Sequence, residues 1–90
     1  MFAKIFDSEK YGQIVAMVGV EEDENPSVRF YAKPESMGVC MNSHVFQDTD
    51  EGYTDRDKLF ESVDLARAEE AVSPIFALIA FAEDLNSDET

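Results

Sequence analysis

Cysteine and histidine commonly act as nucleophiles, bases and metal ligands, and this chain has one of each, Cys40 and His44. Both fall on one face of a segment whose side chains alternate as in a β-strand. Four residues along a strand span about 13 Å, whereas a catalytic Cys–His pair must lie within about 3 Å. We therefore expect neither a catalytic pair nor a shared metal ion. The pattern instead predicts a buried Cys40 and a His44 on a polar face.

Closely spaced carboxylates are typical of calcium loops, and Asp48 and Asp50 have the spacing with which an EF-hand loop begins. Such a loop needs Gly at its sixth position and Glu at its twelfth, but the chain has Tyr53 and Leu59 there. The sequence therefore predicts no metal site. It also contains no glycine-rich phosphate loop and no HExxH or CxxC motif, so we expect no cofactor and no catalytic activity.

Acidity is the strongest chemical feature of the chain. It has 20 Asp and Glu against 7 Lys and Arg among 90 residues, a formal net charge of −13. This charge repels nucleic-acid phosphates and anionic lipid headgroups. Direct binding to DNA, RNA or a membrane surface is therefore disfavoured, and the complementary partner is a basic protein surface.

The acidic residues occur in clusters, two of which are candidate binding surfaces for a basic partner. A compact domain of this length has a diameter of about 31 Å, and B-DNA of that length carries about 18 phosphate charges. The protein thus approaches the charge density of a duplex, which is the physical basis of nucleic-acid mimicry. The alternative is a surface that only keeps the protein soluble. The candidate partner-binding residues are Asp48, Asp50, Glu51, Asp55, Asp57, Glu61 and Asp64, and in a separate turn Glu21, Glu22, Asp23 and Glu24.

The first half of the chain has the alternation of a β-sheet. Strands are predicted over residues 2–6, 13–20, 28–33 and 39–46. The second segment is apolar on both faces, as in a central strand, and the third alternates between one buried face and one solvent face. Short polar separators that end in Gly or Pro favour antiparallel hairpins.

The second half changes to a helical period. Thr54 is the predicted N-cap of the first helix. Ser73 followed by Pro74 is typical of a helix start, so we predict a break near residues 72–73, a second helix over 74–85 and a frayed tail at 86–90. The apolar stripe of the first helix is Leu59, Phe60, Val63 and Ala66.

These elements predict one α+β domain over residues 1–90. The expected fold is a four-stranded antiparallel β-sheet within residues 1–47, followed by two C-terminal α-helices within 54–85 that pack on one face of the sheet.

The predicted second helix is apolar on nearly all sides, more than one face of a small sheet can cover. A homodimer through this helix would cover the remainder. The candidate oligomer interface is Ile75, Phe76, Leu78, Ile79 and Phe81.

Three features bear on the location of the protein. A single Cys excludes an intramolecular disulfide, the N-terminus lacks the apolar core of a signal peptide, and the longest apolar run, residues 75–82, is shorter than the ~20 residues that span a bilayer. We expect a cytoplasmic protein.

In size, charge and the acidic clusters at residues 21–24 and 48–57, the chain resembles small acidic accessory proteins of phages and prophages. The opening segment MFAKIFD and the PESMGVC segment at 34–40 are also similar to short phage reading frames. The family comprises DNA mimics of the anti-restriction and anti-CRISPR type. The resemblance implies an inhibitor that occupies a basic groove of a host nucleic-acid-binding or defence complex, in the host cytoplasm. The alternative is a structural or assembly module that oligomerises through its apolar second helix.

Overall fold

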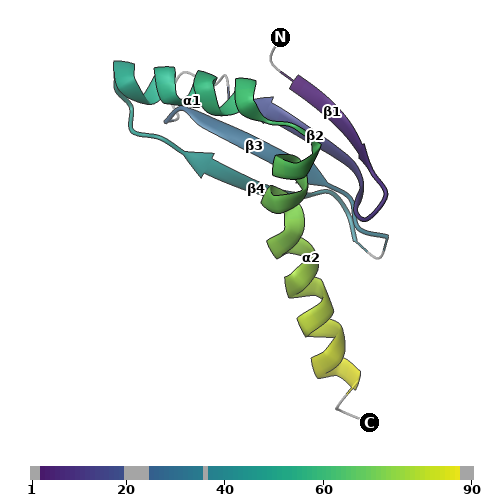
Figure 1. The fold of residues 1–90 in the computed structure, drawn as a ribbon. Coiled ribbons are helices and arrows are strands. Elements are labelled where there is room, and N and C mark those ends of the chain that lie inside the picture. Colours follow the sequence, from purple (N-terminus) through teal and green to yellow (C-terminus); the bar gives the residue numbers. More distant parts are fainter. Residues whose placement is uncertain (1–2, 20–24, 36, 88–90) are drawn as a thin grey trace.

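The computed structural model describes residues 3–19, 25–35 and 37–87. Figure 1 shows a β-sheet with two helices on one side of it. The elements in chain order are β1 (Ala3–Ser8), β2 (Gly12–Val18), β3 (Ser27–Ala32), β4 (Cys40–Val45), α1 (Asp50–Ser62) and α2 (Leu65–Ser87). The predicted α+β fold is confirmed, with strand bounds that differ from the expected ones by one or two residues.

The sheet is a four-stranded antiparallel meander in the order β1-β2-β3-β4. β2 is a central strand, as its two apolar faces predicted. The β1–β2 hairpin turns through Gly12, whose φ of 78° is readily adopted only by glycine. β1 and β4 form the two edges of the sheet.

The core lies between the sheet and the helices. On β3, the predicted inward residues Val28, Phe30 and Ala32 are all buried, because successive strand side chains point to opposite faces. The helices contribute fewer buried apolar side chains than the sheet. The core residues are Ile14, Ala16, Val18, Val28, Phe30, Ala32, Phe60, Val63, Ala68 and Val72.

Helix α1 begins five residues earlier than predicted. Its N-cap is Thr49, whose hydroxyl oxygen accepts from the Gly52 N–H at 3.0 Å. Thr54, the predicted cap, lies inside the helix and donates its hydroxyl to the Asp50 carbonyl. The early start is possible because position 52 is glycine: a Cβ there would collide with the Gln47 carbonyl oxygen.

The C-terminal end of α1 is capped by a residue from β1. The Lys4 ammonium donates to the carbonyls of Phe60 (2.7 Å), Glu61 (3.2 Å) and Val63 (3.3 Å), and it lies 4.9 Å from the centre of the Phe60 ring. A cation is favourable here because the last carbonyls of a helix have no partner within it and carry partial negative charge.

The predicted helix break near residues 72–73 is wrong. The chain breaks instead at Val63, which is extended, and Asp64, whose carboxylate accepts from the Arg67 N–H at 2.9 Å and so caps α2. Pro74 lies inside α2. A proline removes one helical hydrogen bond, and here the buried Val72 before it and the half-buried Phe76 after it fix both halves of the helix.

Helix α2 is tied to the sheet along its first half. The Ser8 hydroxyl donates to the Glu69 carboxylate at 2.7 Å, and Asn42 of β4 donates its amide to the Ala71 carbonyl at 2.8 Å. The Phe76 ring packs on Tyr11 of the β1–β2 hairpin, with centroids 4.6 Å apart.

The second half of α2 leaves the sheet and gives the molecule an elongated shape of 53 × 25 × 18 Å (Figure 1). The radius of gyration is 15.0 Å, against about 12 Å for a compact domain of this length. Helix α2 extends to Ser87, two residues beyond the predicted end. The remainder of the predicted frayed tail, 88–90, lies outside the described residues.

Candidate functional site

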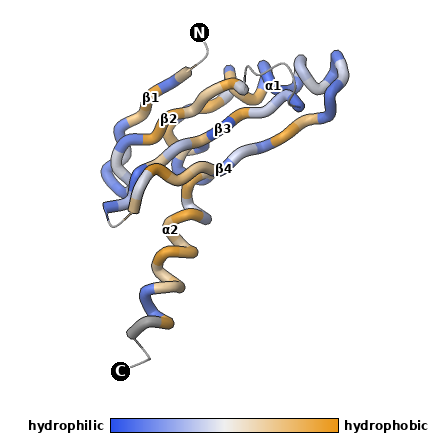
Figure 2. The backbone as a smooth tube through the Cα atoms, turned by 180° about the vertical axis from the view of Figure 1, so that it is seen from behind, coloured by the Kyte–Doolittle hydropathy of each residue, from blue (hydrophilic) through white to orange (hydrophobic). Residues whose placement is uncertain are grey.

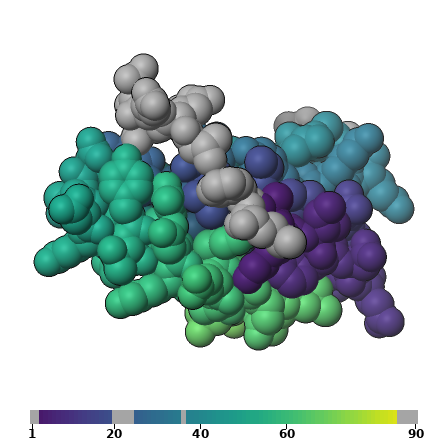
Figure 3. Space-filling model, turned by 90° about the horizontal axis from the view of Figure 1, so that it is seen from above, coloured from purple at the N-terminus to yellow at the C-terminus, as the bar shows by residue number. Residues whose placement is uncertain are grey.

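The acidic residues predicted from the β4–α1 connection and α1 are all exposed. We refer to them as the acidic face of α1. In Figure 3 the teal residues of α1 lie at the surface at one end of the molecule. The acidic face comprises Asp48, Asp50, Glu51, Asp55, Asp57, Glu61 and Asp64.

Helical geometry brings most of these carboxylates together. At 3.6 residues per turn, Asp50, Asp57 and Glu61 fall within about 40° of one another around the axis of α1. Glu51 and Asp55 flank them on one side. Thr54 and Lys58, both exposed, lie between these two groups. The opposite side of the helix carries the buried Gly52 and Phe60. The predicted cluster is therefore a solvent-facing surface that one lysine interrupts, on a helix whose other side is anchored in the core.

Little positive charge compensates this surface. Residues 48–64 contain seven acidic residues against Arg56 and Lys58, which leaves a net charge of −5. Within the described chain, the carboxylates of Asp48, Asp55 and Glu61 make no hydrogen bond or ion pair. They are fully available to an external cation.

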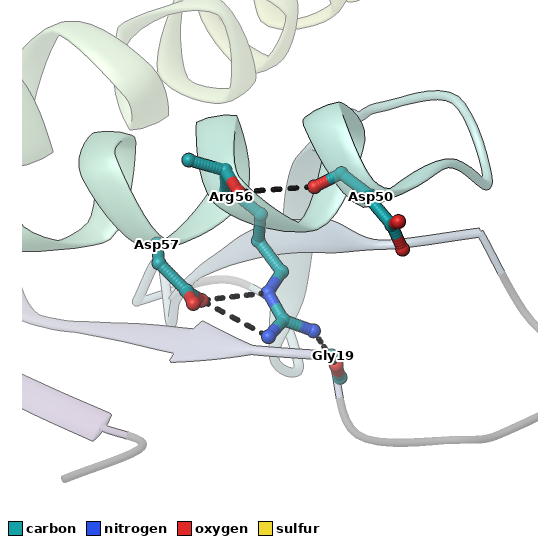
Figure 4. Close-up of polar contacts among 5 residues, drawn as sticks. Gly19, Asp50, Arg56 and Asp57 are labelled. Carbon is teal, nitrogen blue, oxygen red and sulfur yellow. Dashed lines mark hydrogen bonds and ion pairs between the residues drawn. The ribbon is translucent and has the colours of Figure 1, made fainter.

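Arg56 is oriented away from most of the acidic face. Figure 4 shows its guanidinium between Asp57 and Gly19, while the Asp50 carboxylate lies apart from it. Arg56 donates to Asp57 Oδ1 at 3.0 Å and to the Gly19 carbonyl at 3.3 Å, and it lies 5.0 Å from the centre of the Tyr53 ring. Only 16% of its side chain is exposed, so Arg56 serves mainly to dock α1 beside the end of β2.

Two predicted site residues have structural roles as well. Asp57 pairs with Arg56, and Asp64 lies beyond α1 and caps α2. The second predicted cluster, Glu21, Glu22, Asp23 and Glu24, lies outside the described residues. Of the two predicted acidic clusters, the acidic face of α1 is therefore the one that lies within the described residues.

The predicted oligomer interface on α2 divides into two sides. Ile75, Phe76 and Ile79 are half-buried, and Phe76 and Ile79 face the β1–β2 hairpin. Leu78 and Phe81 are 67% and 60% exposed. Figure 2 shows this part of α2 as mainly hydrophobic down to a hydrophilic stretch near its end. The exposed side is larger than predicted because the helix extends past the sheet.

Sequence reasoning missed a second apolar surface, on the face of the sheet opposite the helices. There Ile5, Val15, Tyr31 and Met41 form one row of directly paired residues across all four strands. Ile5 is 66% exposed and Met41 53%. The alternation in the sequence placed these residues opposite the core, but it could not show that no described helix covers them.

Nucleophilic and metal-binding chemistry gains no support from the geometry. Cys40 and His44 pair with Ala32 and Val28, so they lie on one face of β4 at separate positions, as predicted. The predicted burial of Cys40 is wrong, because Cys40 is only half-buried near the end of the edge strand β4. His44 is exposed, but it lies on the helix-facing side of β4 beside an apolar groove and not on a polar face as predicted. No group of three or more His, Cys, Asp or Glu within the described residues is arranged to hold a metal ion.

A largely apolar groove of about 480 Å³ lies beside His44, between β4 and the junction of α1 and α2. Its lining is Phe30, His44, Phe46, Leu59, Val63, Arg67, Glu70 and Ala71.

No protein family, curated protein or solved structure matches the chain. Within the described residues, no helix combines the length and the apolar character needed to cross a membrane.

Proposed function

We propose that this protein is a non-catalytic, cytoplasmic binding protein whose acidic face of α1 occupies a basic, nucleic-acid-binding groove of another protein. In this proposal the carboxylates take the place of phosphates, as in the DNA-mimic accessory proteins of phages that the chain resembles. The protein would then act as an inhibitor, because a groove filled by α1 is closed to nucleic acid.

The observation that carries the proposal is the exposure of carboxylates along one anchored helix, where Asp48, Asp55 and Glu61 make no hydrogen bond or ion pair within the described residues. The 13 residues of α1 extend about 20 Å, a length over which one strand of B-DNA presents about six phosphates. Five carboxylates of the acidic face lie within α1 itself, at residues 50, 51, 55, 57 and 61, which is close to that number of phosphates. A rigid helix also loses little conformational entropy on binding, which favours affinity.

The experiment reverses charge at residues that make no other contact. The test variant combines Asp48→Lys, Asp55→Lys and Glu61→Lys. It spares Asp50 and Glu51, which favour the N-terminus of α1, and it spares Asp57 and Asp64, which form the contacts described above.

A matched control reverses three exposed carboxylates at the opposite end of the sheet, Asp7, Glu9 and Glu35. Both variants change the net charge from −13 to −7. A difference between them therefore reports position and not total charge.

Wild-type protein and both variants are used to capture proteins from a lysate of the source cells at 50 and 500 mM salt. We expect wild type and the control to capture nucleic-acid-binding proteins that added duplex DNA displaces, and the α1 variant to capture at least tenfold less. Equal capture by the folded α1 variant, or capture that DNA does not displace, would contradict the proposal. The acidity would then serve solubility only.

The exposed apolar side chains on α2 favour a second candidate, a structural or assembly module that oligomerises through this helix. Charge reversal on α1 separates the two, because assembly through an apolar helix does not require the acidic face.

A further inference from the structure

The exposed side of α2 carries a regular apolar row. Pro74, Leu78, Phe81 and Leu85 are spaced by four, three and four residues, the repeat by which two helices pack along a common seam. At 3.6 residues per turn they fall within about 60° around the helix axis. We refer to these four residues as the α2 seam.

The α2 seam points away from the molecule's own sheet. Phe76, Ile79 and Glu83 on the other side of the helix line an open groove of about 630 Å³ against the β1–β2 hairpin and the β3–β4 loop. Leu78, Phe81 and Leu85 are instead 67%, 60% and 52% exposed. The side of α2 nearest the sheet is thus partly covered, while the large apolar side chains on the far side are more than half exposed within the described structure.

We propose that the α2 seam is covered by the α2 seam of a second copy of this chain, with the two helices antiparallel. This inference names the partner and the geometry of the second candidate function above, and it does not depend on what the acidic face of α1 binds. The seam of a coiled coil has two alternating heptad positions, a and d. In an antiparallel pair, a residue at position a of one helix lies opposite a residue at position d of the other. A single register therefore matches all four residues: Leu78 opposite Phe81 of the other copy, and Pro74 opposite Leu85.

The distribution of charge selects the antiparallel orientation. Glu83 and Asp84 are near the C-terminal end of α2, where the helix dipole is also negative. A parallel pair would bring both Asp84 carboxylates and both negative helix ends to the same end of the pair. In the antiparallel register the two ends lie apart along the pair, and Glu83, which lines the groove on the other side of the helix, takes no part in the contact.

The size of the interface predicts weak association. The seam from Pro74 to Leu85 is only about 17 Å long, so the contact is smaller than the ~800 Å² per partner of a standard interface. Two copies with a net charge of −13 also repel. We therefore expect a dimer that forms at high protein concentration and is favoured by salt.

The test measures the oligomeric state by sedimentation velocity from about 20 μM to 1 mM protein in 500 mM salt. The seam variant combines Leu78→Glu and Phe81→Glu, and Glu is as good a helix former as Leu. The control combines Ile5→Glu and Val45→Glu on the helix-free sheet face. The control residues are 66% and 57% exposed against 67% and 60% in the seam, and the added charge is the same.

We expect wild type and the control to dimerise. The dimer dissociation constant of the seam variant should be at least tenfold higher, so that it stays mainly monomeric. A wild-type monomer of 10.1 kDa over the whole range would overturn the inference. So would a folded seam variant that dimerises like wild type, or a dimer that only the sheet-face variant disrupts.

The register has its own test. Leu78→Cys and Phe81→Cys are each made with Cys40→Ser, which removes the native thiol, and the proteins are oxidised mildly with diamide, separately and mixed. The antiparallel register predicts a disulfide-linked dimer mainly in the mixture. Cross-linking of each variant with itself would indicate a parallel pair, and no cross-link in a persistent dimer would exclude this register.

Discussion

Helix α1 and the second half of α2 are both exposed to solvent on one side, yet their exposed surfaces have opposite chemistry. Helix α1 lies along the sheet with Phe60 buried at 6% exposure, and its outer side is acidic. The second half of α2 leaves the sheet, and its outer side presents Leu78, Phe81 and Leu85. Charge on an outer surface is the usual arrangement for an amphipathic helix. A row of large apolar side chains in the same position indicates a surface that another chain covers.

The two helices also differ in what holds them in place. Helix α1 has a capping hydroxyl at its start, a lysine from β1 at its end and a buried phenylalanine between them. Beyond Phe76, the described part of α2 touches its own sheet only along one partly covered side. Isolated helices shorter than about 12–15 residues are marginal in water. Packing of the exposed half of α2 against a second helix would therefore stabilise it.

The largest expected effect compares the same substitution in the two helices. Phe60→Ala removes a buried ring and should lower the free energy of unfolding by about 3–5 kcal/mol. Phe81→Ala removes a ring that is 60% exposed and should change it by less than about 0.5 kcal/mol. Urea denaturation at low micromolar concentration, where we expect a monomer, measures both. A large loss for Phe81→Ala there would show that α2 is buried within one copy.

A glycine substitution tests the start of α1. Gly→Ala normally stabilises a helix by about 1 kcal/mol, but at Gly52 the added Cβ would collide with the Gln47 carbonyl. We expect Gly52→Ala to destabilise the protein by about 2 kcal/mol, since overpacking forces the backbone to move. Gly38→Ala is the control, because nothing lies within 4 Å of a Cβ at that position. The midpoint of thermal unfolding should fall clearly more in Gly52→Ala than in Gly38→Ala. Equal shifts of the two midpoints would show that the backbone of residues 47–52 can move to accept the added Cβ.

A lysine substitution tests the end of α1. Lys4→Met keeps the length of the side chain but removes the ammonium that binds three carbonyls. The expected loss is about 1 kcal/mol, because charged hydrogen bonds are strong but this group is partly exposed. Lys58→Met, on the exposed side of α1, is the control. It changes the net charge by the same amount as Lys4→Met and should have little effect on the free energy of unfolding. If both variants unfold alike in urea, the lysine cap contributes only through its charge.

The smallest expected effect is the response of dimerisation to salt, and the acidic face of α1 should respond with the opposite sign. Raising salt from 50 to 500 mM screens like charges between two copies, so dimerisation through the α2 seam should strengthen by about threefold, or about 0.6 kcal/mol. The same change should weaken capture of a basic partner by the acidic face of α1. Sedimentation and capture at both salt concentrations measure the two responses. Responses of the same sign would show that one surface serves both functions.

Hydrophobic alternation was sufficient to predict the sheet. Strands of period two with short turns between them leave few topologies other than a meander, and the inward residues of β3 follow directly from their alternation. The exposed acidic face of α1 was also predictable, because carboxylates are seldom buried without a partner. The orientation of Arg56 away from most of that face was not, since it depends on where the Gly19 carbonyl lies.

The boundaries of the helices were less predictable, because local signals compete. Ser73 and Pro74 have the local pattern of a helix start, whereas Asp64 has an equally good capping side chain with fewer neighbouring signals. Packing on both sides of Pro74 holds α2 together across the proline. The sequence alone could not weigh one lost hydrogen bond against contacts with β4 and the β1–β2 hairpin.

The sequence by itself determined the elements of this protein, the identity of its inward strand residues and the acidity of its first helix. These follow from side-chain periodicity and charge, which are local properties of the chain. Only the tertiary structure decided that α2 continues through Pro74 and extends past the sheet, that Lys4 caps α1 across the molecule, and that no helix of the described residues covers the second apolar face of the sheet. Each of these depends on the distance between residues far apart in the sequence, and that distance is set by packing.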